Sequence, residues 1–242
     1  MEHVLRAYAG DIFFYFKVHE EPKPAIIYLS GFPSNGSYDD KINLLYEKGY
    51  NVFVPLYRGS FQSNGSFLER NPVRDLEEFY DYISKGKAIE LYNEKEINFK
   101  NTCTYLYGSS YGGSMALGLA AVRSIDKIVL SGPVWSWDSH SEKEEDLQQL
   151  IGFVKRAFKH LYRLDTEDLQ GRLREFEELK PAFYKDKINA ELLVFHDTED
   201  KVVNYKHTEK HARDLKSKVV KHNYGHNSVV EEMIDFTEGF LD

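Results

Sequence analysis

The sequence predicts an α/β fold in which a mostly parallel central sheet is flanked by helices. Short apolar runs alternate with stretches of helical spacing along most of the 242 residues. This is the element order of a parallel sheet whose strands are joined by helical crossovers. A hydrophobic content of 42%, with 14% aromatic residues, is enough for one sizeable core. We therefore expect a single domain over residues 1–242.

The first half of the chain predicts a hairpin followed by alternating strands and helices. The predicted strands are short and apolar, and they cover residues 4–8, 12–19, 25–29 and 50–55. The first two flank Gly10, which suits a tight turn. The predicted helices cover residues 38–48 and a stretch from Pro72, whose apolar side chains recur at helical spacing.

The second half repeats the alternation of strand and helix. Its predicted strands cover residues 102–107, 126–131, 192–195 and 217–224. Its predicted helices cover residues 114–122, 205–215 and 229–241. We expect all of these strands to belong to the same sheet.

One segment is too long for a simple crossover. Residues 138–185 contain two apolar stripes at helical spacing, and they predict a helical cap at the carboxyl edge of the sheet. Two helices packed on the flank of the sheet are the alternative. Aromatic side chains in this segment and just before it would line an apolar pocket under a cap, or fill a local core otherwise; they are Trp135, Trp137, Phe153 and Phe158.

A G-x-S-x-G pattern at residues 108–112 carries the strongest chemical signal. A β-rich run precedes it, and small, helix-favouring residues follow it, so the pattern has the strand–turn–helix context of a nucleophile elbow. Gly108 and Gly112 allow strand and helix to approach closely. Ser110 would then project its hydroxyl from the edge of the sheet.

A serine nucleophile needs a histidine base and a carboxylate that orients it. Asp200 and His226 each follow a predicted strand, in the order serine, acid, histidine. His226 also follows a glycine, unlike most of the nine histidines, for which structural roles are expected. Asp197 lies in the same acidic loop as Asp200 and is the alternative acid.

These motifs resemble the catalytic domain of the prolyl oligopeptidase family, a group of serine hydrolases with the α/β-hydrolase fold. The resemblance covers nearly the whole chain after the first strands. It rests on P-x-Y-R-G-S at residues 55–60, G-x-S-Y-G-G at residues 108–113, the aspartate loop at residues 196–203 and the Gly-His pair at residues 225–226. It implies a triad of Ser110, Asp200 and His226.

The resemblance also implies an oxyanion hole made by the backbone N–H groups of Phe32 and Tyr111. Two positions depart from the family pattern, because Ser30 replaces the usual histidine before Gly31, and Asp197 replaces the glycine after His196. Arg58 resembles the family's loop arginine, and a structural ion pair is an equal interpretation.

The expected activity is hydrolysis of a small ester or amide through an acyl-enzyme. The family's peptidases usually carry an added propeller domain, which this sequence lacks, so we expect an esterase, with a peptidase of the prolyl oligopeptidase or acylaminoacyl type as the alternative. A lyase or another non-hydrolytic enzyme on this scaffold, and a silent binding protein, are further alternatives. A binding protein would normally lose the serine or the histidine, and this chain has both.

Composition limits the remaining possibilities. The net charge of −8 argues against a nucleic-acid partner, and no apolar run is long enough for a membrane span. One cysteine excludes an internal disulfide, and no signal peptide is evident. We expect a cytoplasmic protein that acts on a small ester or a short peptide, with no cofactor and no metal.

Overall fold

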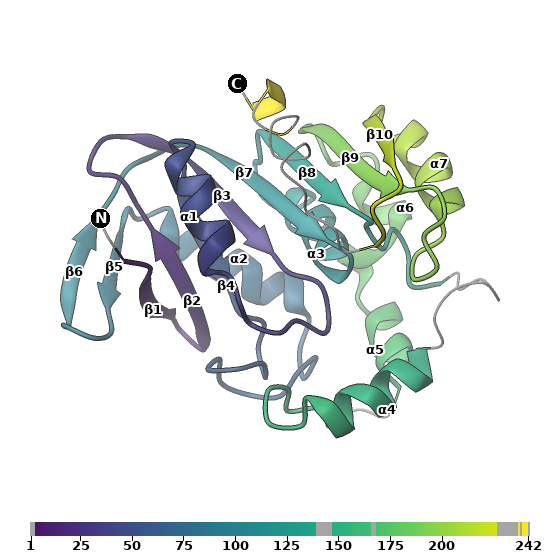
Figure 1. Ribbon diagram of the computed structural model, residues 1–242, viewed down its shortest axis with the longest axis horizontal. Coiled ribbons are helices and arrows are strands. Elements are labelled where there is room, and N and C mark those ends of the chain that lie inside the picture. Colours follow the sequence, from purple (N-terminus) through teal and green to yellow (C-terminus); the bar gives the residue numbers. More distant parts are fainter. Residues whose placement is uncertain (1–2, 139–146, 166–167, 227–236, 238, 242) are drawn as a thin grey trace. The chain divides into compact units, whose positions relative to one another are not determined.

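The structure is a computed structural model that describes residues 3–138, 147–165, 168–226, 237 and 239–241 (Figure 1). The chain divides into two compact units. The first unit comprises Met1–Tyr28, Pro33–Thr104 and Phe153–Glu167. The second unit comprises Leu29–Phe32, Tyr105–Gly152 and Asp168–Asp242.

The first unit contains strands in the order β1-β2-β4-β3. Their bounds are Leu5–Ala9 for β1, Ile12–Lys17 for β2, Lys23–Leu29 for β3 and Asn51–Pro55 for β4. The pairs β1–β2 and β2–β4 are antiparallel, whereas β3 and β4 run parallel. The predicted opening hairpin is therefore confirmed, and the sheet is mixed.

Two helices of the first unit carry the predicted apolar stripes. They are α1 (Asp39–Glu47) and α2 (Pro72–Ile83). The side chain of Asn71 accepts the Val73 N–H at 3.0 Å and caps α2, while Pro72 occupies the first helical position, where its missing N–H costs nothing. Val73, Leu76 and Phe79 are buried along one face of this helix, as their spacing predicts.

A small hairpin in the first unit was not expected from the sequence. Strands β5 (Lys87–Glu90) and β6 (Lys95–Asn98) pair antiparallel. Each has only four residues, and most of them are polar, so neither presents a strand-like apolar pattern. The hairpin lies beside β1, where the Leu91 N–H donates to the Arg6 carbonyl at 2.9 Å.

Arg58 lies at the centre of an ion-pair cluster in the first unit. Its Nη2 is 2.8 Å from Asp75 Oδ1, and its Nη1 is 2.8 Å from Asp11 Oδ2. Arg70 also pairs with Asp75. The side chains of Arg58 and Asp75 are only 10% and 5% exposed. These contacts support the structural interpretation of Arg58.

A stretch of the predicted cap is paired with a loop of the first unit. The Phe61 N–H donates to the Leu161 carbonyl at 2.6 Å, and the Arg163 N–H donates to the Gly59 carbonyl at 2.8 Å. Ser60 and Tyr162 form an isolated β-bridge. Residues 158–163 are thereby attached to the loop at residues 59–67, which includes the end of the P-x-Y-R-G-S motif.

The second unit contains four parallel strands in the order β7-β8-β9-β10. Their bounds are Asn101–Ser109 for β7, Lys127–Ser131 for β8, Glu191–Asp197 for β9 and Lys218–His222 for β10. Ser109 pairs with Ser131, and Ser131 with Phe195. The carboxyl ends of β7, β8 and β9 therefore meet at one edge.

The helices of the second unit cover these strands. Helix α3 (Tyr111–Ala120) is buried along its whole length. Helix α7 (Tyr205–Asp214) packs on β9 and lies beside β10 (Figure 1). The predicted helix over residues 229–241 falls almost entirely outside the described residues. The chain as a whole has a mixed sheet with flanking helices, as the sequence predicts.

The predicted cap, residues 138–185, contains four short helices, and residues 139–146 and 166–167 lie outside the described part. The helices are α4 (Leu147–Ala157), α5 (Leu169–Glu175), the 3-10 helix η1 (Glu177–Leu179) and α6 (Pro181–Tyr184). In the second unit, η1 and α6 pack against α3, as expected for helices on the flank of the sheet. A cap over Ser110 and a single domain over residues 1–242 stay predictions.

Pro181 begins α6, because proline fits the first helical position. Among the helices that the structure describes, none has the length and apolar composition that crossing a bilayer would require.

The Arg58 cluster leads to a prediction about stability. Replacing Asp75 with alanine leaves the buried guanidinium of Arg58 without its main partner, and we expect the free energy of unfolding to fall by about 3–5 kcal/mol. Glu96→Ala is the matched control, because Lys87 and Glu96 form an ion pair whose side chains are 56% and 46% exposed; there we expect a loss below about 1 kcal/mol. Urea unfolding measures both changes, and equal losses would contradict the structural role of Arg58.

Candidate active site

Ser110 lies in a sharp turn between β7 and α3. Its backbone has φ 52° and ψ −117°, a conformation that residues other than glycine rarely adopt. The Ser110 N–H donates to the Ser131 carbonyl at 2.9 Å, while its own carbonyl accepts the N–H groups of Gly113 at 2.9 Å and Val134 at 3.1 Å. These bonds hold the strained conformation that aims the hydroxyl away from the sheet.

The glycines of the motif are required by close backbone approach. A Cβ on Gly108 would lie 2.5 Å from the Gly112 carbonyl oxygen, and a Cβ on Gly112 would collide with the carbonyl oxygen of Leu29. No side chain can relax such contacts, because both obstacles are backbone atoms. Close approach of strand and helix thus explains both glycines of the G-x-S-x-G pattern.

The structure brings the three predicted side chains of the triad together. Ser110 Oγ is 2.9 Å from His226 Nε2, and His226 Nδ1 is 2.6 Å from Asp200 Oδ2. The carboxylate can only accept, so Nδ1 carries the proton and Nε2 is free to accept the serine hydroxyl proton. All three residues belong to the second unit.

Asp200 is surrounded by donors. Its side chain is fully buried, and its Oδ1 accepts the N–H groups of Val202 at 2.8 Å and Val203 at 3.0 Å. Burial by itself would raise the pKa of this carboxyl, but hydrogen bonds from His196 and His226 outweigh it and hold the pKa of Asp200 below its ordinary value. The carboxylate is therefore charged at neutral pH.

Asp197, the alternative acid, has different partners. Its Oδ1 accepts the Glu199 N–H at 2.7 Å, and its Oδ2 accepts the Gly225 N–H at 2.6 Å. Asp197 thus holds the backbone just before His226, while Asp200 contacts the imidazole. Of the two candidates, the geometry favours Asp200 as the group that orients the histidine.

The two predicted oxyanion donors, Phe32 and Tyr111, belong to two segments of the second unit. Tyr111 follows Ser110 directly in the chain, and Phe32 follows Gly31. A Cβ built on Gly31 would lie 3.3 Å from Ser110 Cβ and 3.9 Å from Ser110 Oγ. The rings of Phe32 and Tyr111 have their centroids 6.1 Å apart. The Gly31–Phe32 backbone therefore lies beside the serine.

The four aromatic residues that the sequence offers for a pocket lie in different surroundings. Trp135 is buried in the second unit, where its ring stacks on His211. Trp137 is buried as well, with its ring centroid 5.9 Å from that of Tyr111. In the first unit, Phe153 is 46% exposed and packs edge-on against Phe158. Trp137 is thus the member of the set that lies next to the residue following Ser110.

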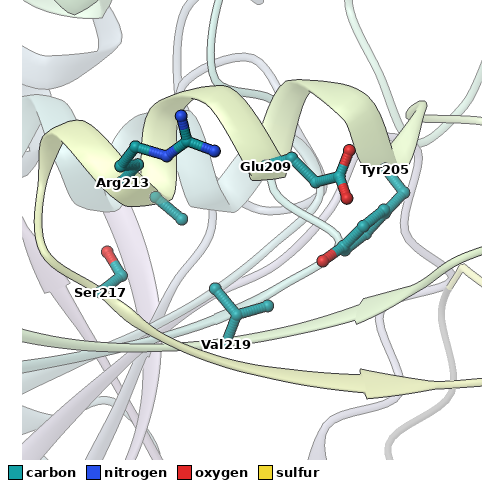
Figure 2. Close-up of a pocket in the computed structure, with 6 residues that line it drawn as sticks. Tyr205, Glu209, Arg213, Ser217 and Val219 are labelled. Carbon is teal, nitrogen blue, oxygen red and sulfur yellow. The ribbon is translucent and has the colours of Figure 1, made fainter.

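The second unit also has a cavity of about 370 Å³ between α7 and β10 (Figure 2). It is lined by Tyr205, Glu209, Ala212, Arg213, Ser217 and Val219. None of the three predicted triad residues lines it. This cavity is separate from the predicted site.

No separate role for His196 was expected from the sequence, although its imidazole lies at Asp200. The side chain is 0% exposed, and its Nε2 is 3.2 Å from Asp200 Oδ2. The signal in the sequence that could have indicated this contact is the position of His196 near the end of a strand, four residues before Asp200.

Comparison with known proteins identifies the family. The model of the prolyl oligopeptidase family matches residues 36–228, more than half of the chain. No curated protein matches the chain.

Several solved structures share the fold of this chain. A predicted CIB-like hydrolase from Thermoplasma acidophilum is 20% identical, with 99% of this chain and 97% of that chain covered and a TM-score of 0.64. Esterase Pf2001 of Pyrococcus furiosus is 18% identical, with 99% and 91% covered and a TM-score of 0.69. Acylaminoacyl peptidase of Pyrococcus horikoshii is 17% identical, with a TM-score of 0.67; the match covers 99% of this chain and 41% of that longer one.

The strained serine turn, the parallel strands that end beside it and the match over residues 36–228 lead to one conclusion. The chain has the α/β-hydrolase fold, belongs to the prolyl oligopeptidase family and is a serine hydrolase.

Proposed function

We propose that the protein hydrolyses small carboxylic esters, with Ser110 as nucleophile, His226 as general base and acid, and Asp200 as the group that orients His226. The observation that carries the proposal is the unbroken pair of contacts, 2.9 Å from Ser110 Oγ to His226 Nε2 and 2.6 Å from His226 Nδ1 to Asp200 Oδ2. Each contact has the length and the donor order that proton transfer from the hydroxyl requires.

The reaction proceeds in two halves. Ser110 Oγ attacks the ester carbonyl carbon as His226 Nε2 takes the hydroxyl proton, and the carbonyl oxygen becomes an oxyanion. The N–H groups of Phe32 and Tyr111 stabilise that oxyanion. The tetrahedral intermediate collapses, the ester C–O bond breaks, and His226 returns the proton to the departing alcohol. Water then attacks the acyl-enzyme in the same way, which releases the acid and restores Ser110.

Asp200 acts by electrostatics and orientation. The pKa of its carboxyl lies below the ordinary value, so Asp200 remains an anion next to the imidazolium that forms during each half-reaction. Charge stabilisation of this kind is stronger for a buried carboxylate than for one in water. Asp200 accepts the Nδ1 proton as a hydrogen bond without taking it.

The choice of an ester over a peptide bond is supported by the structural neighbours. The match with the Pyrococcus furiosus esterase covers 91% of that protein, whereas the match with the acylaminoacyl peptidase covers 41%. An acylaminoacyl or prolyl-type peptidase remains the second candidate, because the family model describes prolyl oligopeptidases.

The first prediction concerns the nucleophile. A fluorophosphonate probe should label the wild type, and Ser110→Ala should abolish labelling and lower kcat/KM for p-nitrophenyl esters by about 10⁴-fold or more. Ser109→Ala, a change at the neighbouring buried serine, is the control and should keep its labelling. Persistent labelling of the Ser110 variant, or none of the folded wild type, would disprove the proposal.

The second prediction separates the two acidic candidates. Asp200→Asn should lower kcat by about 10⁴-fold, because the amide favours the wrong tautomer of His226. Asp197→Asn keeps an oxygen that can accept the Gly225 N–H, so kcat should fall by no more than about tenfold. Steady-state kinetics of both variants on one ester decide between them, and the reverse order would assign the acid role to Asp197.

The third prediction concerns substrate class. We expect turnover of p-nitrophenyl acetate and butyrate, and kcat/KM for N-acetyl-alanine p-nitroanilide lower by about 100-fold or more, since the amide leaving group is poorer and needs added positioning. Product analysis by chromatography should find the free acid and alcohol. Efficient cleavage of the anilide would favour the peptidase, and an eliminated or peroxidised product would favour a non-hydrolytic enzyme.

A further inference from the structure

His196, in β9, is a polar side chain with no exposed surface. A buried imidazole is costly unless both ring nitrogens have partners. The His196 Nε2 atom is 2.9 Å from the Val203 carbonyl oxygen and 3.2 Å from Asp200 Oδ2. Its Nδ1 is 2.6 Å from Thr208 Oγ1. Both nitrogens are therefore satisfied within the second unit.

The partners determine where the proton of this imidazole sits. Nε2 faces a carbonyl and a carboxylate, which only accept, so Nε2 carries a hydrogen. The indole Nε1 of Trp135 can only donate, and it donates to Thr208 Oγ1 at 2.7 Å. The hydroxyl hydrogen of Thr208 is then available to Nδ1, which accepts it. The contacts of His196 thus fit the tautomer that carries its hydrogen at Nε2.

The Nε2–H of His196, whose hydrogen bond goes to the Val203 carbonyl, consequently also faces the carboxylate oxygen that accepts from His226. His226 Nδ1 is 2.6 Å from Asp200 Oδ2, the atom that His196 also contacts. The other oxygen, Oδ1, accepts two backbone N–H groups. Donors on both oxygens leave the carboxylate a single orientation, in which Oδ2 points at His226.

We propose that His196 is a positioning residue for the hydrolysis: its Nε2–H fixes the Asp200 carboxylate and draws part of the negative charge on Oδ2 away from His226. This inference rests on the proposed function, because it concerns the group that orients the general base. His196 acts through Asp200 and does not touch the reacting atoms.

Other titratable groups face this cluster from the packed elements. Asp197 lies in β9 with His196, Tyr205 and His211 lie in α7, and Lys221 and His222 lie in β10. Lys221 pairs in register with His196, and His222 with Asp197. Burial lowers the pKa of His211 and that of His222, so both are neutral near pH 7. The charge that changes during the reaction is that on His226.

The sign of the effect follows from electrostatics. Without the His196 donor, more negative charge remains on Oδ2 next to His226. That charge stabilises the imidazolium, so the acid limb of the kcat/KM profile moves to higher pH. A loss of packing alone would lower activity across the whole pH range without moving this limb.

Two isosteric substitutions separate the effects. In His196→Gln the amide nitrogen replaces Nε2 and keeps the donor to Asp200, whereas in His196→Asn the amide lies at the Nδ1 position and keeps only the partner of Thr208. We expect the asparagine variant to lose about 10- to 100-fold in kcat with little change in KM, and its acid limb to shift upward. The glutamine variant should stay within about threefold of the wild type.

His211→Gln is the matched control, because this buried histidine stacks on Trp135 with ring centroids 5.8 Å apart but is not among the groups that orient Asp200. It should keep the wild-type rate and acid limb. Equal losses in the Asn and Gln variants without a shift of the limb, or no loss in either, would overturn the proposal.

A measurement on the wild type keeps the inference testable if the variants do not fold. Nitrogen-15 NMR of the histidine rings at pH 7 should find His196 as the neutral Nε2–H tautomer; an Nδ1–H tautomer or an imidazolium would overturn it. Failure of the proposed function is recognised separately, since the wild type would then not react with the fluorophosphonate probe at Ser110.

Discussion

The backbone conformation of Ser110 is the constraint on which the rest of the site depends. A positive φ at a residue with a side chain costs about 1–3 kcal/mol, and it persists only where other contacts hold it. Those contacts come from Ser131 at the end of β8, from Gly113 in α3 and from Val134 in the following loop. The direction of the hydroxyl is therefore a property of the packed strands and helix. The five-residue motif alone would not keep it.

The site also requires a buried anion at Asp200, and this requirement explains the hydrogen bonds of the loop after β9. Desolvation opposes the charged form of Asp200, so donors must be provided from several directions. The loop supplies two from its own backbone, at Val202 and Val203, and His226 supplies a third. The His196 Nε2 atom in β9 lies 3.2 Å from the same oxygen as His226. Asp197 uses the same chemistry for another purpose, since it accepts the N–H of Gly225 and fixes the approach to His226. Two carboxylates close in sequence thus have separate partners.

Local signals in the sequence explain what could be predicted. Ser110, Asp200 and His226 each follow an apolar run, and parallel strands end at a common edge, so their meeting could be expected. The choice between Asp197 and Asp200 depends on side-chain direction within one short loop, which periodicity does not encode. The role of His196 could not be predicted either, because the ring nitrogen that carries its hydrogen depends on contacts with Val203 and Thr208, which lie outside β9. The hairpin of β5 and β6 escaped prediction because its strands are short and polar.

Part of the predicted cap is attached to the first unit by hydrogen bonds. In the first unit, the Ser34 N–H donates to the hydroxyl of Tyr162 at 2.8 Å, and Tyr162 forms the β-bridge with Ser60. Residues 158–163 are therefore held at two places within the first unit, at Ser34 and at the loop of residues 59–67. Because Tyr162 takes part in both attachments, its side chain and backbone together fix the position of this stretch on the first unit.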